Sequence, residues 1–219
     1  MTLKVFWQDP YLTRLDTRIA AVNANLVTVE QTIFYAFNGG QESDSGTIAD
    51  RPVLEARKDG LEIFYALDAD HGLQIGQPVA MLIDWERRYR LMRLHFAAEI
   101  VLELTYRVKP GIEKIGAHIA QDKSRIDFAL GESITPLLPN LQAQANELIA
   151  ADRPIISAFT DEANERRYWE IDGFARVACG GTHIRRTGEV GQIKLKRNNI
   201  GKGKERIEIY LVSPDQSQN

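Results

Sequence analysis

The one cysteine of this 219-residue chain lies in the segment CGGTHIRRTGEVG, residues 179–191, four positions before a histidine. A lone cysteine forms no internal disulfide. Gly180 and Gly181 disfavour a helix, because glycine costs about 1 kcal/mol relative to alanine there. We therefore expect Cys179 and His183 on a loop or strand end. A thiolate beside an imidazole is typical of half a metal site; the alternative is that Cys179 is a small buried hydrophobic residue.

A second pair of candidate ligands, His95 and Glu99, lies in the segment HFAAE. Residues at positions i and i+4 of a helix share one face, with Cβ atoms about 5–6 Å apart. Two side chains so placed can hold one ion, as in zinc sites with two histidines at this spacing. Together with Cys179 and His183 they form a set of acceptable zinc ligands. The alternative for His95 and Glu99 is an ordinary hydrogen-bonded pair.

The elements that would position these residues change type along the chain. Residues 1–84 predict a small β-barrel-like domain, because β-rich runs alternate with turn signals and Asp59-Gly60 favours a hairpin turn. The segment 86–108 contains no glycine or proline and predicts a long helix with one buried face, ended by Pro110-Gly111. Its buried face is expected to hold Leu91, Leu94, Ala98, Val101 and Leu102.

A second helix is predicted over 139–152, with Pro139 near its start. Further strands are expected in the runs KSRIDFAL, PIISAF, WEIDGFARVA, QIKLKR and RIEIYLV, after TIFYAF and QPVAMLIDW in the first part. The predicted fold class is therefore α+β, with an antiparallel sheet and a long helix in a second domain over 85–212. The polar residues 213–219 are expected to form a tail.

The charge of the chain is uneven. The net charge is −3, so the whole molecule does not attract nucleic acid. Between Ile184 and Ile207, however, eight basic residues face only two glutamates. They are either a solvated hairpin or a strip that contacts phosphates. The candidates for such contacts are Arg186, Lys194, Lys196, Arg197, Lys202 and Lys204.

No apolar run approaches the roughly 20 residues that cross a bilayer, and the first residues lack a secretory pattern. A single cysteine suits a reducing compartment. We therefore expect a cytoplasmic protein without a membrane partner.

Several motifs, in matching order, resemble one family. CGGTH with RTGEVG, RLMRLHFAAE, GAHIAQDKSRIDF and TIFYAFNGGQESDSGTI together resemble the free-standing alanyl-tRNA editing proteins, the AlaX family, and the editing domain of alanyl-tRNA synthetase. The resemblance covers roughly residues 28 to 210. Several motifs at matching spacing are far more specific than one.

The resemblance implies a metal-dependent deacylase that edits in trans. Its substrate would be tRNA for alanine mischarged with serine or glycine, bound by the acceptor end, and no ATP would be used. It implies zinc bound by His95, Glu99, Cys179 and His183. His118 and Gln121 would orient water or the ribose, unless they only make strand-end hydrogen bonds. The glycine-rich motif corresponds to Gly39, Gly40, Gln41 and Asp44.

The sequence departs from the family pattern at three places. Glu99 replaces a metal-binding histidine, which adds a harder ligand and a negative charge. Phe96 replaces a threonine, which changes the expected polarity of the amino-acid pocket. Ala36-Phe37-Asn38 replaces the start of the glycine-rich motif, where asparagine also accepts left-handed backbone angles.

Other functions remain open at this point. The chain can be a catalytically degenerate tRNA-binding module, or a metal hydrolase of a small ester or amide. Cys179 can also be a nucleophile with His183 as its base, although the sequence identifies no third group to orient that base.

Overall fold

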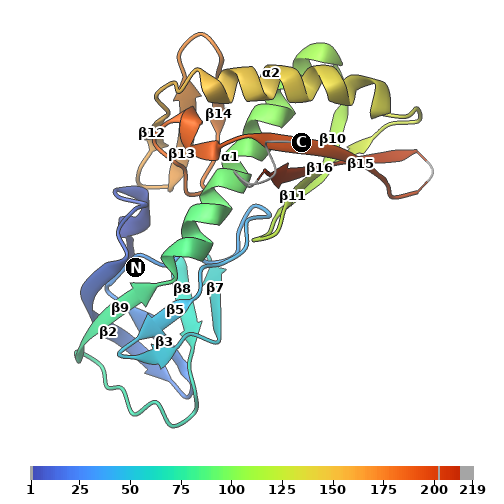
Figure 1. Cartoon of the computed structure of the whole chain (residues 1–219). Helices are drawn as coiled ribbons and strands as arrows, with labels where there is room; N and C mark the ends of the chain where they lie inside the picture. The colour runs from blue at the N-terminus through green and yellow to red at the C-terminus, as the bar shows by residue number, and fades with distance from the viewer. Residues whose placement is uncertain (1, 202, 213–219) are drawn as a thin grey trace. The chain divides into compact units, whose positions relative to one another are not determined.

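The computed structural model describes residues 2–201 and 203–212 (Figure 1). Lys202 and the predicted tail 213–219 lie outside the described residues. The chain divides into two compact units. The first comprises the residues up to Asn38 together with Glu42–Arg90, and the second comprises Gly39–Gln41 and the residues from Leu91 onward. The fold class is α+β with mostly antiparallel sheets, as the sequence predicts.

In the described part of the first unit, seven antiparallel strands form one sheet in the order β6-β5-β9-β2-β3-β8-β7. Their bounds are β2 (Arg14–Asn23), β3 (Leu26–Val29), β5 (Gly46–Ile48), β6 (Arg51–Pro52), β7 (Glu55–Asp59), β8 (Glu62–Ala66) and β9 (Pro78–Ile83). The sheet is open, with β6 and β7 as its end strands. The short strands β1 (Leu3–Lys4) and β4 (Gln31–Thr32) pair in parallel, and a 3-10 turn, η1 (Val5–Trp7), follows β1.

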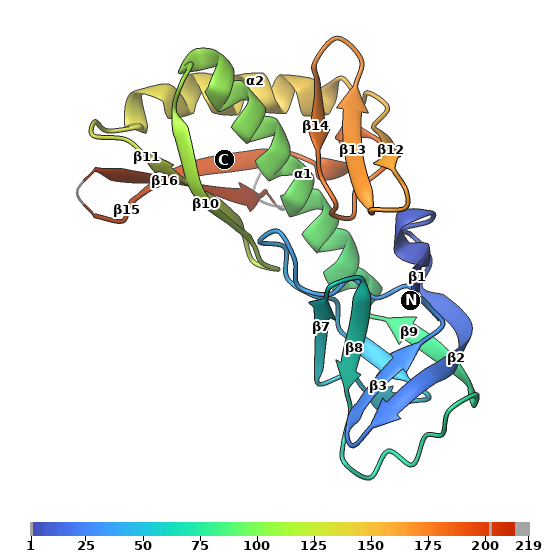
Figure 2. The ribbon, with the colours of Figure 1, turned by 180° about the vertical axis from the view of Figure 1, so that it is seen from behind.

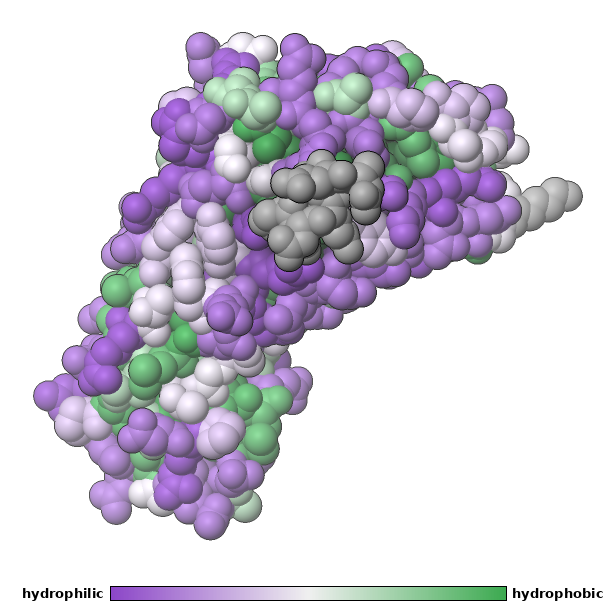
Figure 3. All heavy atoms as spheres, in the orientation of Figure 1, coloured by the Kyte–Doolittle hydropathy of each residue, from purple (hydrophilic) through white to green (hydrophobic). Residues whose placement is uncertain are grey.

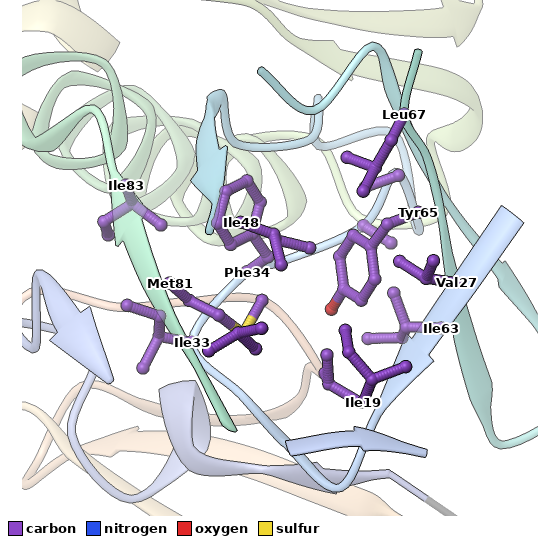
Figure 4. Packing of buried hydrophobic residues seen from close by; sticks show 14 of the residues in the cluster. Ile19, Val27, Ile33, Phe34, Ile48, Ile63, Tyr65, Leu67, Met81 and Ile83 are labelled. Carbon is purple, nitrogen blue, oxygen red and sulfur yellow. The ribbon is translucent and has the colours of Figure 1, made fainter. Parts of the chain in front are cut away.

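The hydrophobic core of the first unit lies on one face of this sheet (Figure 4). Side chains such as Ile19, Tyr65 and Met81 come from different strands and point toward one another. The Asp59-Gly60 hairpin is confirmed, and Gly60 has a φ of 56° in its turn. The prediction of a strand over TIFYAF is wrong for most of its length, because residues 33–36 are buried in the core without joining a ladder.

Helix α1 (Trp85–Val108) begins in the first unit and continues in the second. Asp84 caps its start, since Asp84 Oδ1 accepts the backbone N–H of Arg87 at 3.0 Å. The five predicted apolar positions are buried, but the expectation of a single buried face is wrong. From residue 91 to 105 the helix is buried nearly all round, because sheets of the second unit flank it on two sides (Figure 2).

One of these flanking sheets is four-stranded and antiparallel within the described residues, in the order β10-β11-β16-β15. Its strands are β10 (Glu113–Ile119), β11 (Ser124–Ala129), β15 (Ile193–Asn199) and β16 (Lys204–Leu211). Helix α2 (Leu138–Ala150) follows the short turn η2 (Thr135–Leu137). Asn146 of α2 bonds the N–H and the C=O of Ile193, so the helix satisfies backbone groups at the edge of β15.

The other sheet is formed by β12 (Ile156–Asp161), β13 (Arg166–Ile171) and β14 (Ala175–Ala178). The run WEIDGFARVA is not one strand. It makes the β13–β14 hairpin, because the chain turns at Asp172-Gly173, where Gly173 has a φ of 64°. A last 3-10 turn, η3 (Thr187–Val190), follows the cysteine loop. No helix in the described part of the chain has the length and apolar character needed to cross a membrane.

Candidate metal centre

Three of the predicted ligands converge in the second unit. His95 of α1 places Nε2 at 3.4 Å from Cys179 Sγ, and His183 places Nε2 at 3.2 Å from the same sulfur. The three candidate donor atoms all lie within 4.8 Å of one another. Both histidines are buried and Cys179 is half-buried. Two imidazoles and a thiol in this arrangement match the ligand types of zinc sites.

The cysteine loop approaches helix α1 because Gly181 lacks a side chain. A Cβ atom at Gly181 would lie 2.0 Å from Cε1 and 2.6 Å from Nδ1 of His95. Strand β14 ends at Ala178, and the N–H of Cys179 still bonds Arg167 O at 2.9 Å, which anchors the loop. The predicted loop at a strand end is confirmed.

The outer nitrogen of each histidine is held by a polar side chain. His95 Nδ1 lies 2.6 Å from Gln41 Oε1, and His183 Nδ1 lies 2.9 Å from Ser157 Oγ. Such contacts fix the ring orientation and leave Nε2 for a metal, which is common in metal sites. Gln41 also donates to Thr182 Oγ1 at 2.9 Å, so it joins the helix to the cysteine loop.

Sequence reasoning missed Ser157, because no spacing links a strand serine to the CGGTH segment. It identified Gln41 only as part of a glycine-rich motif. The structure explains why that motif needs glycine. Gly40 has a φ of 88°, and a Cβ there would lie 2.6 Å from Ala117 O. The close approach lets Gly40 O accept the N–H of Ile119 at 2.8 Å, and Gln41 follows at once.

Glu99 lies beside the cluster rather than among its three converging donors. Its Oε1 is 3.2 Å from His95 Nε2, as in the hydrogen-bonded pair that the sequence also allowed. Burial opposes charge on both groups. The Cys179 sulfur and Glu99 nevertheless raise the pKa of His95 to about 10, and His95 lowers the pKa of Glu99 to about 2. The negative neighbours of His95 thus favour the protonated form of its imidazole.

The pKa of His183 shifts in the opposite direction from that of His95. Burial, and then the positive charge of His95, hold the pKa of His183 well below its usual range. A neutral imidazole is the form that binds metal. The positive charge of the buried Arg167 also lowers the pKa of His183, and the Arg167 guanidinium itself lies over the Phe159 ring at 5.1 Å.

Phe96 does not line an open pocket. It is fully buried, and its ring packs edge-on against Trp169 at 5.2 Å and against His183 at 5.7 Å between ring centroids. The Phe96 ring therefore packs against the His183 ring and helps to hold it in place. We expected Phe96 to change the polarity of an amino-acid pocket, but its observed contacts are those of a buried packing residue.

Asp44, the last predicted member of the glycine-rich motif, belongs to the first unit. It forms a fully buried ion pair with Arg88, and its Oδ2 accepts the N–H of Tyr35 at 2.6 Å. Arg88 also donates to Ile33 O and Pro10 O. This network orders the backbone around the motif within the first unit.

The other predicted site residues lie elsewhere in the second unit. His118 is in β10 opposite Arg125, beside the backbone of Gly40, and Gln121 is exposed in the turn that follows β10. Their predicted contacts with water or ribose remain predictions.

Some basic side chains of the predicted strip already pair with carboxylates. Arg197 forms two hydrogen bonds to Glu205, and Arg186 pairs with Asp152 at 2.7 Å. Lys194, Lys196 and Lys204 are exposed. The surface over β15 is largely hydrophilic (Figure 3).

The segment RTGEVG holds its loop against α2. Thr187 Oγ1 donates to Leu148 O at 3.0 Å, and Glu189 Oε1 accepts the N–H groups of Arg185 and Arg186. Arg93 of α1 donates twice to Val190 O. These contacts fix the chain that leaves His183.

The fold and the site define an α+β protein with a preformed His–Cys–His cluster on a helix and a glycine loop. Residues 170–208 match the family model described as "Threonyl and Alanyl tRNA synthetase second additional domain". The chain is 32% identical to the alanyl-tRNA editing protein AlaX-M of Pyrococcus horikoshii, over 96% of this chain and 98% of the relative. It is 31% identical to AlaX-M of Methanosarcina barkeri, over 97% and 100%.

The chain also matches a longer protein, of which it covers only a part. The chain is 34% identical to the alanine–tRNA ligase of Ignicoccus hospitalis, over 95% of this chain but 26% of the ligase. The full-length matches are thus to free-standing proteins. The chain belongs to the AlaX-M family of alanyl-tRNA editing proteins.

Proposed function

We propose that this protein is a trans-editing hydrolase that removes serine or glycine from mischarged tRNA for alanine by hydrolysing the aminoacyl ester. Family membership supports the substrate class. The observation that carries the proposal is the convergence of His95, Cys179 and His183 from distant parts of the sequence, with both outer ring nitrogens held.

The residues present fit a zinc ion. Two buried imidazoles and a thiol offer three suitable donors. Zinc bound at this site would supply Lewis acidity for polarising an ester carbonyl or acidifying a water. His95, Cys179 and His183 would hold it, and Glu99 would be a weaker fourth ligand.

The chain's own residues have separate tasks in this proposal. Gln41 and Ser157 orient the two histidines through Nδ1. His118 and Gln121 are proposed to orient water or the ribose hydroxyl. We propose that residues 85–212 form the editing domain and residues 1–84 a β-rich domain, from which Gly39–Gln41 of the glycine-rich motif join the compact unit of the editing domain.

We propose that tRNA is bound by its acceptor end, with Lys194, Lys196 and Lys204 contacting phosphates. Arg186 and Arg197 contribute less, because Asp152 and Glu205 already neutralise them.

Metal analysis of the purified protein, paired with deacylation of serine from tRNA for alanine, tests the proposal. We expect about one zinc per chain and hydrolysis that a chelator abolishes. Near-stoichiometric zinc that persists unchanged in Cys179→Ala and His183→Ala would refute the ligand assignment. Zinc without turnover on seryl, glycyl or alanyl esters would favour the degenerate tRNA-binding module instead.

A further inference from the structure

Ser157 differs from the other polar groups around the His–Cys–His cluster in its exposure. Gln41 and Thr182 are buried at 1% and bond each other. Ser157, in contrast, is exposed on β12 while its Oγ lies 2.9 Å from His183 Nδ1. The hydroxyl therefore touches the cluster and is also accessible from outside.

The contact with His183 also fixes the direction of the serine hydroxyl. His183 Nε2 faces the Cys179 sulfur at 3.2 Å, on the side where a metal would be held. If Nε2 held a metal, the remaining ring proton would be on Nδ1 and would be donated to Ser157 Oγ. The O–H of Ser157 is then left to donate outward. An oriented donor at an accessible edge is well suited to recognise a hydroxyl group.

Selective editing needs such a group. Seryl and alanyl esters differ by one hydroxyl, and an apolar pocket separates such a pair by only about a hundredfold. The helix residue that follows His95 is Phe96, which is fully buried against Trp169 and His183 and offers no polar atom. Phe96 therefore cannot supply the polar contact to the seryl hydroxyl.

We propose that Ser157 is a specificity-determining residue that donates its hydroxyl hydrogen to the side-chain hydroxyl of a seryl ester. The inference rests on the proposed editing function and adds to it the group that recognises the substrate. The glycyl ester has no side chain, so Ser157 makes no such contact with it. Removing the hydroxyl therefore affects the two esters differently.

The test compares Ser157→Ala with wild type on serine- and glycine-charged tRNA for alanine, with zinc content and zinc affinity measured on the same samples. With both proteins saturated with zinc, we expect kcat/KM for the seryl ester to fall at least about tenfold more than the glycyl value, because any loss of His183 orientation affects both esters alike. Ser157→Thr keeps a hydroxyl and should restore most of the seryl activity. Ser133→Ala, which removes an exposed serine that bonds Thr135, serves as the matched control.

An equal fall on both esters, or no change on the seryl ester, would overturn the assignment, because Ser157 would then act only through His183 or not at all. These results leave the editing function intact, since wild type still hydrolyses both esters. A wild type that hydrolyses neither ester would remove the proposed function together with this inference.

Discussion

Two polar regions of the second unit use their charged groups in different ways. In the His–Cys–His cluster, His95, Cys179 and His183 turn their donor atoms toward one shared point. In the β15–β16 hairpin, charged side chains instead pair with each other, as Arg197 does with Glu205. Convergent donors leave a position for a ligand, whereas paired charges neutralise each other. The number of polar residues in a segment is therefore a poor guide to its chemistry.

The largest expected effect comes from removing the sulfur that the two histidines share. Cys179→Ala should reduce bound zinc from about one per chain to a small fraction, because the two imidazoles would then be joined only by Glu99, the weaker ligand. Deacylation should fall at least about a hundredfold. Elemental analysis and a deacylation time course measure the two effects, and unchanged zinc with unchanged activity would contradict the assignment.

A smaller effect is expected from substituting Gln41, whose side chain contacts Nδ1 of His95. Gln41→Ala removes the partner of His95 Nδ1 and the link to Thr182, so zinc affinity or activity should drop about 10–100-fold. Gln144→Ala is the matched control, since Gln144 is half-buried on α2 and donates to Asn140 Oδ1 at 3.1 Å, away from the cluster. If both variants bind zinc like wild type in a chelator competition, Gln41 does not position His95.

Substitution of Glu99 measures its contribution as the proposed fourth zinc ligand. Glu99→His should tighten zinc binding by about tenfold, because imidazole suits zinc better than a carboxylate that already pairs with His95. Competition with a chelator of known affinity gives the change. Weaker binding in Glu99→His would show that the glutamate is the better ligand in this setting.

Substitutions in the β15–β16 hairpin should have the smallest effects. Their effect on tRNA binding should depend on whether the basic side chain already pairs with a carboxylate. Neutralising the exposed Lys194 and Lys196 should make the slope of log affinity for tRNA against log salt shallower by about 0.7–0.9 each. Arg197→Gln should leave that slope almost unchanged, because Glu205 already occupies the guanidinium. Its cost would instead be a small loss in the free energy of unfolding, because ion pairs of exposed side chains contribute little. Equal slopes for wild type and the double lysine variant would remove the hairpin from the interface.

The same contrast explains how far the sequence predicts this protein. Helix α1 and the hairpin turn at Gly60 follow from local signals, namely a run without glycine or proline and an Asp-Gly pair. Residues 33–36 have strand-forming side chains, but their burial in the core determines their path. The long strand β2 and strand β10 were not anticipated, because their polar, alternating residues resemble loop composition.

In the candidate site, local spacing identifies two pairs, His95 with Glu99 and Cys179 with His183, and the resemblance to the family joins them into one site. Ser157 and the role of Gln41 depend on contacts between residues 26 and 54 positions apart, which no local pattern encodes. The burial of Phe96 is likewise a tertiary property.

The most direct test of the central claim is hydrolysis of serine-charged tRNA for alanine by the same protein sample in three states: as purified, after chelation, and after zinc is restored. We expect the purified protein to hydrolyse the seryl ester, to lose this activity on chelation and to regain it with zinc, while alanine-charged tRNA is largely spared throughout. Hydrolysis that proceeds at the same rate in all three states, with metal removal verified, would contradict it.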